Sequence, residues 1–288
     1  MNNDKPILFS DVEREEGIEG IVGLWLHGPY QNREQALDFV MLRTGYSEVE
    51  LRKAYNGINS FNYSLHDKKP LSRRLTLQTA KLLHYVGNDF FVGLDIGPWL
   101  LECAVAGYEM TDERRKNFSL HQLETTGLSA RSYAQIYGDE AVEVEKGVFK
   151  TFNFFLDAPA AIGLFYRDEP RAVVSVFPED ETTLQIKQIQ GARVVTEEKE
   201  RKTELVFRKS SRGGGCLGTL DWKKFLVRCA EKVGKDLGYS IMSIQGARNN
   251  RWVLDGGLPL ERGLQIYDAT AERLGYAQVG IGNWYKAI

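Results

Sequence analysis

The sequence predicts an α+β protein with a helical N-terminal region over residues 1–145 and, over residues 146–288, a largely antiparallel mixed sheet flanked by helices. Apolar residues recur with helical spacing up to about residue 140, whereas strand-like alternation and continuous apolar runs follow Gly147. Short, turn-rich loops separate the first predicted strands, and such loops favour antiparallel neighbours. The pentapeptide Ile-Gln-Gly-Ala-Arg occurs at 189–193 and again at 244–248, each time at the end of a strand-like segment.

The composition is that of an ordinary globular protein. The 288 residues suffice for one large domain or two ordinary ones, with 43% hydrophobic and 26% charged residues. A net charge of −2 argues against broad binding to nucleic acid or to a membrane surface. The three cysteines and four histidines lack metal-ligand or disulfide spacing, so no metal is expected. No apolar run approaches the ~20 residues of a spanning helix and no signal peptide is recognisable, which together predict a cytoplasmic protein with no membrane partner.

Capping boxes and glycine stops mark the first helices of the N-terminal region. A capping box at 32–35 opens a helix that ends at Gly45, and a second box at 47–50 opens one that ends near Gly57. Apolar residues with helical spacing predict further helices at 72–86, 98–107 and 120–137.

The C-terminal region begins with a series of short strands, which are predicted at 149–156, 160–166, 172–177 and 182–190. Turn segments such as Asp157-Ala158-Pro159 separate them. Residues 203–208 form one more candidate strand, and the charged stretch 196–202 is predicted to be a solvated loop or hairpin end.

A helix capped by Asp221 and closed by Gly238 is predicted next, followed by a strand at 239–245. The remaining elements are a helix at 259–275 and a hairpin of two strands at 276–279 and 283–288.

A glycine cluster directly precedes the helix that Asp221 caps. Gly213, Gly214 and Gly215 would offer free backbone amides beside the positive end of the helix dipole, which suits a phosphate group. Arg212 would add a bidentate contact to the same phosphate. The alternative interpretation is that these glycines form a flexible loop without a ligand.

From about residue 148 to 288 the order of elements resembles the larger part of the GNAT acyltransferase fold. In that fold a meander is followed by the cofactor-binding helix, a strand, a helix and a hairpin. The segment 266–276 is similar to the helix, Leu-Gly-aromatic and strand ending that is frequent in the superfamily. Gln190-Gly191, Trp222 and Tyr267-Asp268 resemble the strand end, Trp-bearing helix and terminal helix of uncharacterised bacterial GNAT-like proteins.

The resemblance implies acetyl-CoA or another acyl-CoA as co-substrate and an amine as acyl acceptor. The family's phosphate-binding motif, Gln/Arg-x-x-Gly-x-Gly/Ala, is matched in part at 188–193 and at 212–217. Both matches depart from the motif at its last position, where Arg193 and Leu217 stand. The cofactor contacts expected from these segments are Gln190, Gly191, Arg212, Gly213, Gly214 and Gly215.

Acyl transfer needs a base for the amine and an acid for the leaving thiolate. GNAT enzymes often place a tyrosine four residues before the glycine of the Leu-Gly-aromatic ending, but Ala271 occupies that position here, and Tyr267 lies one turn earlier. Tyr267 is therefore either a catalytic acid or a core residue of its helix, and no carboxylate or histidine stands out as the base. Asn249 and Arg251 follow the second pentapeptide and are expected to contact the acceptor.

Other functions stay open at this point. The chain could be a non-enzymatic binding protein on the same fold, since a fold does not fix chemistry. The first two predicted helices also have the length and glycine turn of a helix-turn-helix pair with Arg52 and Lys53 on its second helix, although nearby acidic residues would repel nucleic acid. The acceptor is expected to be a small-molecule or peptide amine, and a homodimer stays open.

Overall fold

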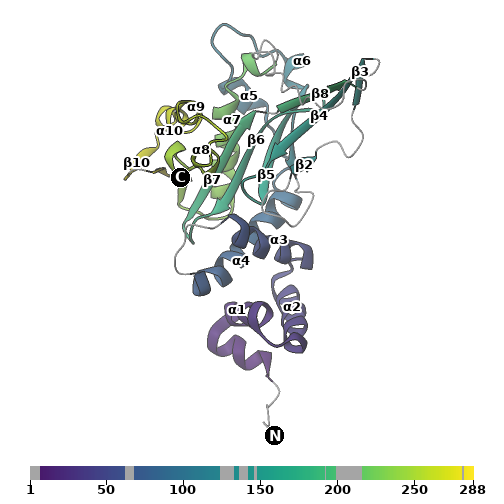
Figure 1. Cartoon of the computed structure of the whole chain (residues 1–288), viewed down its shortest axis with the longest axis vertical. Coiled ribbons are helices and arrows are strands. Elements are labelled where there is room, and N and C mark those ends of the chain that lie inside the picture. The colour runs from purple at the N-terminus through teal and green to yellow at the C-terminus, as the bar shows by residue number, and fades with distance from the viewer. Residues whose placement is uncertain are drawn as a thin grey trace. The chain divides into compact units, whose positions relative to one another are not determined.

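The computed structural model describes residues 7–61, 68–123, 133–135, 142–145, 148–191, 193–198, 216–280 and 282–288 (Figure 1). The chain divides into two compact units, Met1–Tyr85 and Val86–Ile288. This division differs from the predicted boundary at residue 145, because a strand from the supposedly helical region joins the large sheet. The α+β class is confirmed.

The first unit consists of helices packed in pairs, α1 with α2 and α3 with α4. Their bounds are α1 Phe9–His27, α2 Tyr30–Thr44, α3 Glu48–Phe61 and α4 Lys68–His84. Helix α2 begins at Tyr30, so the capping box predicted at 32–35 lies inside the helix instead of at its start. It ends as predicted at Gly45, whose left-handed backbone (φ 74°) favours glycine.

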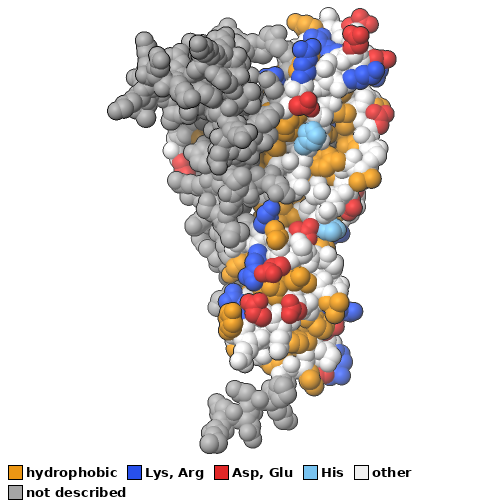
Figure 2. Space-filling view, turned by 90° about the vertical axis from the view of Figure 1, so that its right-hand side faces the viewer, with side chains coloured by type: hydrophobic (Ala, Val, Ile, Leu, Met, Phe, Trp, Pro, Cys, Tyr) orange, Lys and Arg blue, Asp and Glu red, His pale blue; other side chains and the backbone are white. Residues whose placement is uncertain are grey.

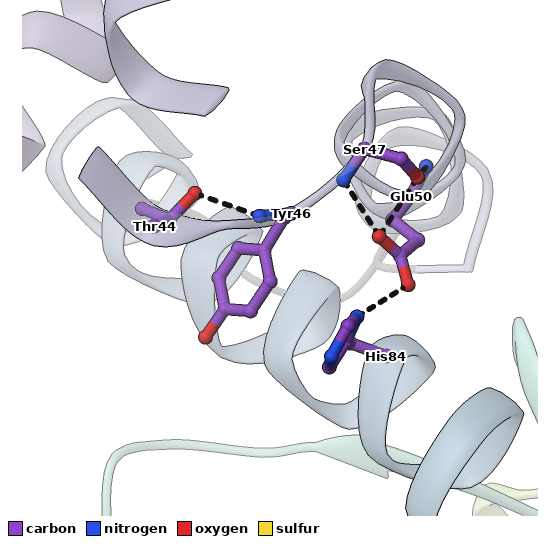
Figure 3. A network of polar contacts seen from close by, with 5 residues as sticks. All are labelled: Thr44, Tyr46, Ser47, Glu50 and His84. Carbon is purple, nitrogen blue, oxygen red and sulfur yellow. Dashed lines mark hydrogen bonds and ion pairs between the residues drawn. The ribbon is translucent and has the colours of Figure 1, made fainter. Parts of the chain in front are cut away.

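The second predicted capping box is confirmed at the start of α3 (Figure 3). The backbone N–H of Ser47 donates to Glu50 Oε2 over 2.7 Å, and the N–H of Glu50 donates back to Ser47 Oγ over 3.2 Å. His84 Nδ1 from α4 lies 3.0 Å from Glu50 Oε1. Partial burial opposes ionisation of Glu50, but the hydrogen bonds from Ser47 and His84 outweigh it, so the pKa of Glu50 lies below its ordinary value.

Arginines of this unit lie in ion pairs with carboxylates of the same helix or of a neighbouring helix. Arg52 Nε lies 2.6 Å from Glu48 Oε1, and Arg74 Nε lies 2.6 Å from Glu19 Oε1. Figure 2 shows basic and acidic side chains interspersed over the helices on the face it displays. Binding of a phosphate backbone requires basic side chains that are not offset by acidic neighbours, so these mixed charges argue against nucleic-acid binding by the α2–α3 pair.

The second unit contains a seven-stranded sheet among the described residues, in the order β1-β5-β6-β7-β9-β11-β10. Neighbours are antiparallel except β7 and β9, which are parallel. The strands are β1 Phe118–Leu123, β5 Ala160–Tyr166, β6 Glu169–Pro178, β7 Thr183–Gly191, β9 Ile241–Ile244, β10 Ala277–Val279 and β11 Asn283–Ala287. A smaller sheet has β4 (Val148–Phe155) paired with β2 (Tyr133–Gln135), β3 (Val142–Glu145) and β8 (Arg193–Glu198).

Several local predictions about these strands were wrong. The helix predicted at 120–137 is replaced at its start by β1, in which Phe118, Leu120 and Leu123 are buried and pair with β5. The predicted four-strand meander shortens to β5, β6 and β7, because β4 belongs to the smaller sheet. Strand β8 covers part of the segment predicted to be a loop, and the strand predicted at 203–208 lies outside the described residues.

Helix α7 (Trp222–Asp236) packs on β5, β6, β7 and β9 and confirms the prediction for this segment. Asp221 caps it, accepting a hydrogen bond from the N–H of Lys224 over 3.3 Å. The helix buries an amphipathic stripe against the sheet, formed by Phe225, Leu226, Cys229, Ala230 and Val233. The smaller helical elements of the unit are η1 Tyr85–Asp89, α5 Gly97–Glu102, α6 Asp112–Arg115, η2 Cys216–Thr219, η3 Ala247–Asn249 and α8 Arg251–Leu254.

The helix predicted at 259–275 is two short helices, α9 (Leu260–Ile266) and α10 (Asp268–Arg273). The division falls at Tyr267, whose backbone stays in the right-handed helical region but lies away from ideal helical angles (φ −95°, ψ −61°). The closing hairpin is confirmed as β10 and β11, and β11 pairs with β9. No described helix combines the length and the apolar character that crossing a membrane requires.

The two pentapeptide glycines allow a matched test of this fold. A side chain added at Gly246 would overlap the carbonyl oxygen of Gly282, whereas one added at Gly191 would lie 4.0 Å from its nearest neighbours, an ordinary contact. We expect Gly246→Ala to lower the free energy of unfolding by about 3 kcal/mol, because the backbone must shift to make room. Gly191→Ala should change it by less than about 0.5 kcal/mol. Equal losses in urea denaturation would contradict this difference in packing.

Candidate functional site

The parallel strands β7 and β9 stop pairing partway along β7. Their register runs from Thr183 opposite Ile241 to Ile186 opposite Ile244, and the last rung is the hydrogen bond from Gln245 N to Ile186 O, 3.0 Å long. Strand β7 continues along β6 to Gly191, whereas the chain after β9 turns into η3. We call residues 187–191 and 245–250 together the strand fork. The two pentapeptides end strands that are neighbours in the sheet, with the first copy offset by three residues from the second.

A β-bulge on β7 opens the fork. Ser175 of β6 lies opposite Gln188, but the next residue, Val176, lies opposite Ile186, so Lys187 is an extra residue in β7. Beyond the bulge, Gln188 Nε2 donates to Gln190 Oε1 over 2.6 Å, so these two side chains share one face of the sheet. Bulges twist a strand locally and redirect its side chains. Here the bulge coincides with the point at which β7 loses its parallel partner.

Tyr267 fills the fork from the break between α9 and α10. Its side chain is 1% exposed. The hydroxyl is hydrogen-bonded to the backbone of Ile189 on one arm of the fork and to the side chain of Asn250 on the other. Burial and the nearby charge of Asp157 raise the pKa of Tyr267, and the two hydrogen bonds offset only part of that rise. Tyr267 is therefore a protonated hydroxyl at neutral pH.

Asp157 lies in the turn between β4 and β5, and its carboxylate is the charge that acts on this hydroxyl. Its backbone N–H donates to Gln188 Oε1 over 3.2 Å, which fixes the turn beside the bulge. Burial raises the pKa of Asp157 to about 6, against the opposing influence of Lys187. Burial likewise lowers the pKa of Lys187, although Glu179 and Asp157 both favour its charged form.

A second carboxylate, Glu179, lies at the start of the same stretch of sheet. It accepts hydrogen bonds from Ser243 Oγ (2.7 Å), Tyr285 Oη (3.1 Å) and Gln185 Nε2 (3.3 Å). Gln185, Ser243 and Tyr285 occupy paired positions on β7, β9 and β11, so their side chains lie on one face. Glu179 thereby ties three adjacent strands together just before the fork.

Side chains from α10 and β11 fix the second arm of the fork. Asp268 Oδ2 accepts a hydrogen bond from the N–H of Ala247 (2.8 Å), and its Oδ1 accepts one from Trp284 Nε1 (2.9 Å). Asn249 Nδ2 donates to Asn283 Oδ1 over 3.1 Å. These bonds position the turn after β9, because η3 is too short to be stable without tertiary contacts.

The structure brings some of the sequence-predicted site residues together. Gln190 and Gly191 belong to the fork, and Tyr267 packs into it. Gln190 is buried, and the position of Gly191 faces the Trp222 ring. Asn249 is exposed on the second arm, and its side-chain amide is used in the bond to Asn283.

The other predicted contacts are not placed by the structure. Arg251 begins α8, and its side chain is outside the described part of the molecule. The proposed phosphate loop, formed by Arg212, Gly213, Gly214 and Gly215, lies entirely outside the described residues.

Sequence reasoning missed Asp157, Lys187, Glu179 and Asn250. One signal was available for Lys187, because Lys187 and Gln188 are two consecutive polar residues that interrupt the apolar alternation of β7, which is typical of a bulge. Asp157 had no comparable signal, since an aspartate before a proline in a turn is ordinary.

No protein-family model and no curated protein matches this chain in sequence. Among the residues that the structure describes, no group of histidine, cysteine, aspartate and glutamate side chains is arranged to hold a metal ion.

The raised pKa of Asp157 predicts a specific dependence of stability on pH. The folded carboxyl binds its proton more tightly than the unfolded one, whose pKa is near 3.8, so its contribution to stability is largest below about pH 4 and is lost as the pH rises through about 6. In the wild type this carboxyl should lower the free energy of unfolding by about 2–3 kcal/mol as the pH rises from about 4 to 7. We expect Asp157→Asn to abolish that pH-dependent loss.

The measurement is urea denaturation across this range, with the wild-type minus variant difference plotted against pH. Asp168→Asn, in the exposed turn between β5 and β6, is the control and should leave the wild-type curve unchanged. A difference between wild type and Asp157→Asn that is flat with pH would contradict the raised pKa.

Proposed function

We propose that the second unit binds an acyl-CoA thioester and transfers its acyl group to an amine acceptor. The observation that supports this most is the strand fork, in which two parallel strands part around a buried hydroxyl with a carboxylate of raised pKa beside it. The two groups match the two proton transfers of the reaction. Asp157, with a pKa of about 6, is ionised at neutral pH and can accept a proton from an ammonium group. Tyr267 is protonated and can donate to the departing thiolate.

The backbone of the fork suits an elongated ligand. Among the residues that the structure describes, β7 has no parallel partner after Ile186, so polar backbone groups on that edge require other hydrogen-bonding partners. The Tyr267 hydroxyl is the hydrogen-bonding partner of the Ile189 backbone. An amide-containing chain such as the pantetheine arm of CoA offers donors and acceptors to the same edge, in the manner of an added strand.

We assign the phosphate end of the ligand to Arg212, Gly213, Gly214 and Gly215. Arg212 to Gly215 precede α7 in the chain, and the first residue of α7, Trp222, lies beside Gly191 at the end of β7. Free amides before a helix, the helix dipole and an arginine together favour a pyrophosphate. The resemblance to the GNAT fold points to the same ligand, and Asn249 and Arg251 remain the proposed contacts of a small-molecule or peptide amine.

One observation favours a second candidate function, a protein that binds an acyl-CoA without turning it over. The Tyr267 hydroxyl is buried and already has two hydrogen-bonding partners, as a structural tyrosine would. In that case the fork recognises the ligand and Tyr267 only braces its two arms.

Binding is tested first, with the proposed phosphate loop. CoA should raise the melting temperature of the protein, since a ligand that binds only the folded state stabilises it. Arg212→Ala should weaken CoA binding by about 1.5–3 kcal/mol, roughly 10- to 150-fold, through the loss of a charged bidentate contact. Titration calorimetry measures the change, with Lys235→Ala in the last turn of α7 as a control that should bind normally. No binding by the wild-type protein would refute the proposed function.

Turnover is tested with Tyr267→Phe. If the hydroxyl protonates the thiolate, the substitution should lower the rate of thiol release from acetyl-CoA in the presence of amines by roughly 10²-fold or more. Tyr276→Phe is the matched control, because it removes another buried hydroxyl, which donates to Glu231 on α7 over 3.0 Å. Both variants should lose a similar amount of stability, but only Tyr267→Phe should lose turnover. CoA binding without thiol release in the wild type, over a broad panel of amines, would support the binding protein instead.

A further inference from the structure

Lys187 is a lysine held inside the candidate site by the backbone of β7. It is the extra residue of the bulge, two residues after Gln185 and directly before Gln188. Gln185 is hydrogen-bonded to the carboxylate of Glu179, and Gln188 to the backbone of Asp157. Lys187 therefore lies between a glutamine bonded to Glu179 and a glutamine bonded to Asp157. Ile189, two residues further on, is hydrogen-bonded through its backbone to the Tyr267 hydroxyl.

The environment of Lys187 is unusual for a cation. The side chain is half-buried, and both carboxylates favour the ammonium, yet burial still lowers the pKa of Lys187. An amine with a lowered pKa is neutral, and hence nucleophilic, in a larger fraction of molecules at neutral pH. The charges of Asp157 and Lys187 act on each other, so Asp157 is the carboxylate that we assign as acceptor of the proton that the ammonium must lose.

We propose that Lys187 is itself an acyl acceptor, so that a bound acyl thioester acylates its Nζ atom and leaves an amide on the side chain. The inference rests on the proposed function, because it needs an acyl-CoA in the strand fork. It adds a covalent modification site within the fork, whose product is an acyl-lysine.

The step balances without any further reactant. The Lys187 ammonium gives one proton to the Asp157 carboxylate, and the free amine attacks the thioester carbonyl carbon. A C–N bond forms and the C–S bond breaks. The departing thiolate takes the second proton of the nitrogen, directly or through the Tyr267 hydroxyl, which regains it. The products are an N-acyl-lysine and free CoA thiol.

Lys223 is the matched comparison. It too is half-buried, and burial lowers its pKa as well. Its neighbours differ, however, because Arg273 and Arg262 are close, and the nearby carboxylate of Asp221 is paired with Arg273 at 2.9 Å. Lys223 therefore shares the desolvation of Lys187 but lacks a carboxylate available as a base.

The experiment is the acylation of the whole protein by acetyl-CoA at neutral pH, without added amine, followed by peptide mass spectrometry over time. We expect Lys187 in the wild type to gain an acetyl group at least about tenfold faster than Lys223, and Asp157→Asn to slow this by roughly 10²-fold. Lys187→Arg should abolish the fast phase, whereas Lys223→Arg should retain it. Protein unfolded in urea should acetylate both lysines at similar rates.

Site mapping in the wild type decides the question even if a variant fails to fold. CoA binding, measured by the shift in melting temperature, is recorded alongside. If CoA binds and Lys187 is acetylated no faster than Lys223, the inference is wrong and the proposed function is unaffected. If CoA does not bind, the proposed function fails and the inference fails with it.

Discussion

The hydrogen bond from the N–H of Gln245 to the carbonyl of Ile186, 3.0 Å long, is the last rung between the two parallel strands, and the candidate site depends on the ladder ending there. Strand β9 spans Ile241–Ile244, whereas β7 continues to Gly191, so the edge of β7 beyond the rung is left for other partners. Asp268 keeps the chain after β9 from following β7, because it takes the N–H of Ala247. The separation of the strands is thus maintained by specific bonds to a neighbouring helix.

Desolvation dominates the electrostatics of the fork. An isolated ion pair would lower the pKa of its carboxyl and raise that of its amine, but here burial raises the pKa of Asp157 and lowers that of Lys187. The proton affinities of the two groups are therefore brought closer together than they are in water. A proton can then pass from the amine to the carboxylate at a smaller cost in free energy, which is the requirement for a base and its substrate amine.

Local patterns in the sequence predicted most helices and strands. Contacts between residues far apart in the sequence decided where a helix breaks, which turn is buried and which sheet a strand joins. Helix α7 was predictable because Asp221, the apolar stripe and Gly238 all agree. The break at Tyr267 was not, because a stripe that spans 259–275 fits one helix or two short helices equally well. The turn at Asp157 was recognisable from Pro159, but its burial beside the bulge depends on Gln188, which is 31 residues away. For the same reason, the sequence did not indicate that β4 joins the smaller sheet.

The position of the Tyr267 hydroxyl reconciles its two candidate roles. The hydroxyl is bonded to the backbone of Ile189, on the edge that a thioester carbonyl would approach. A neutral hydrogen bond of this kind contributes only about 1 kcal/mol net, so exchanging the hydroxyl for a ligand carbonyl costs little when the ligand supplies an equivalent bond. Tyr267 can therefore brace the empty fork and still turn its proton toward a sulfur atom once a ligand has entered. In the proposed reaction a buried structural tyrosine is compatible with catalysis, because the substrate would replace the hydrogen-bonding partner that Tyr267 must release.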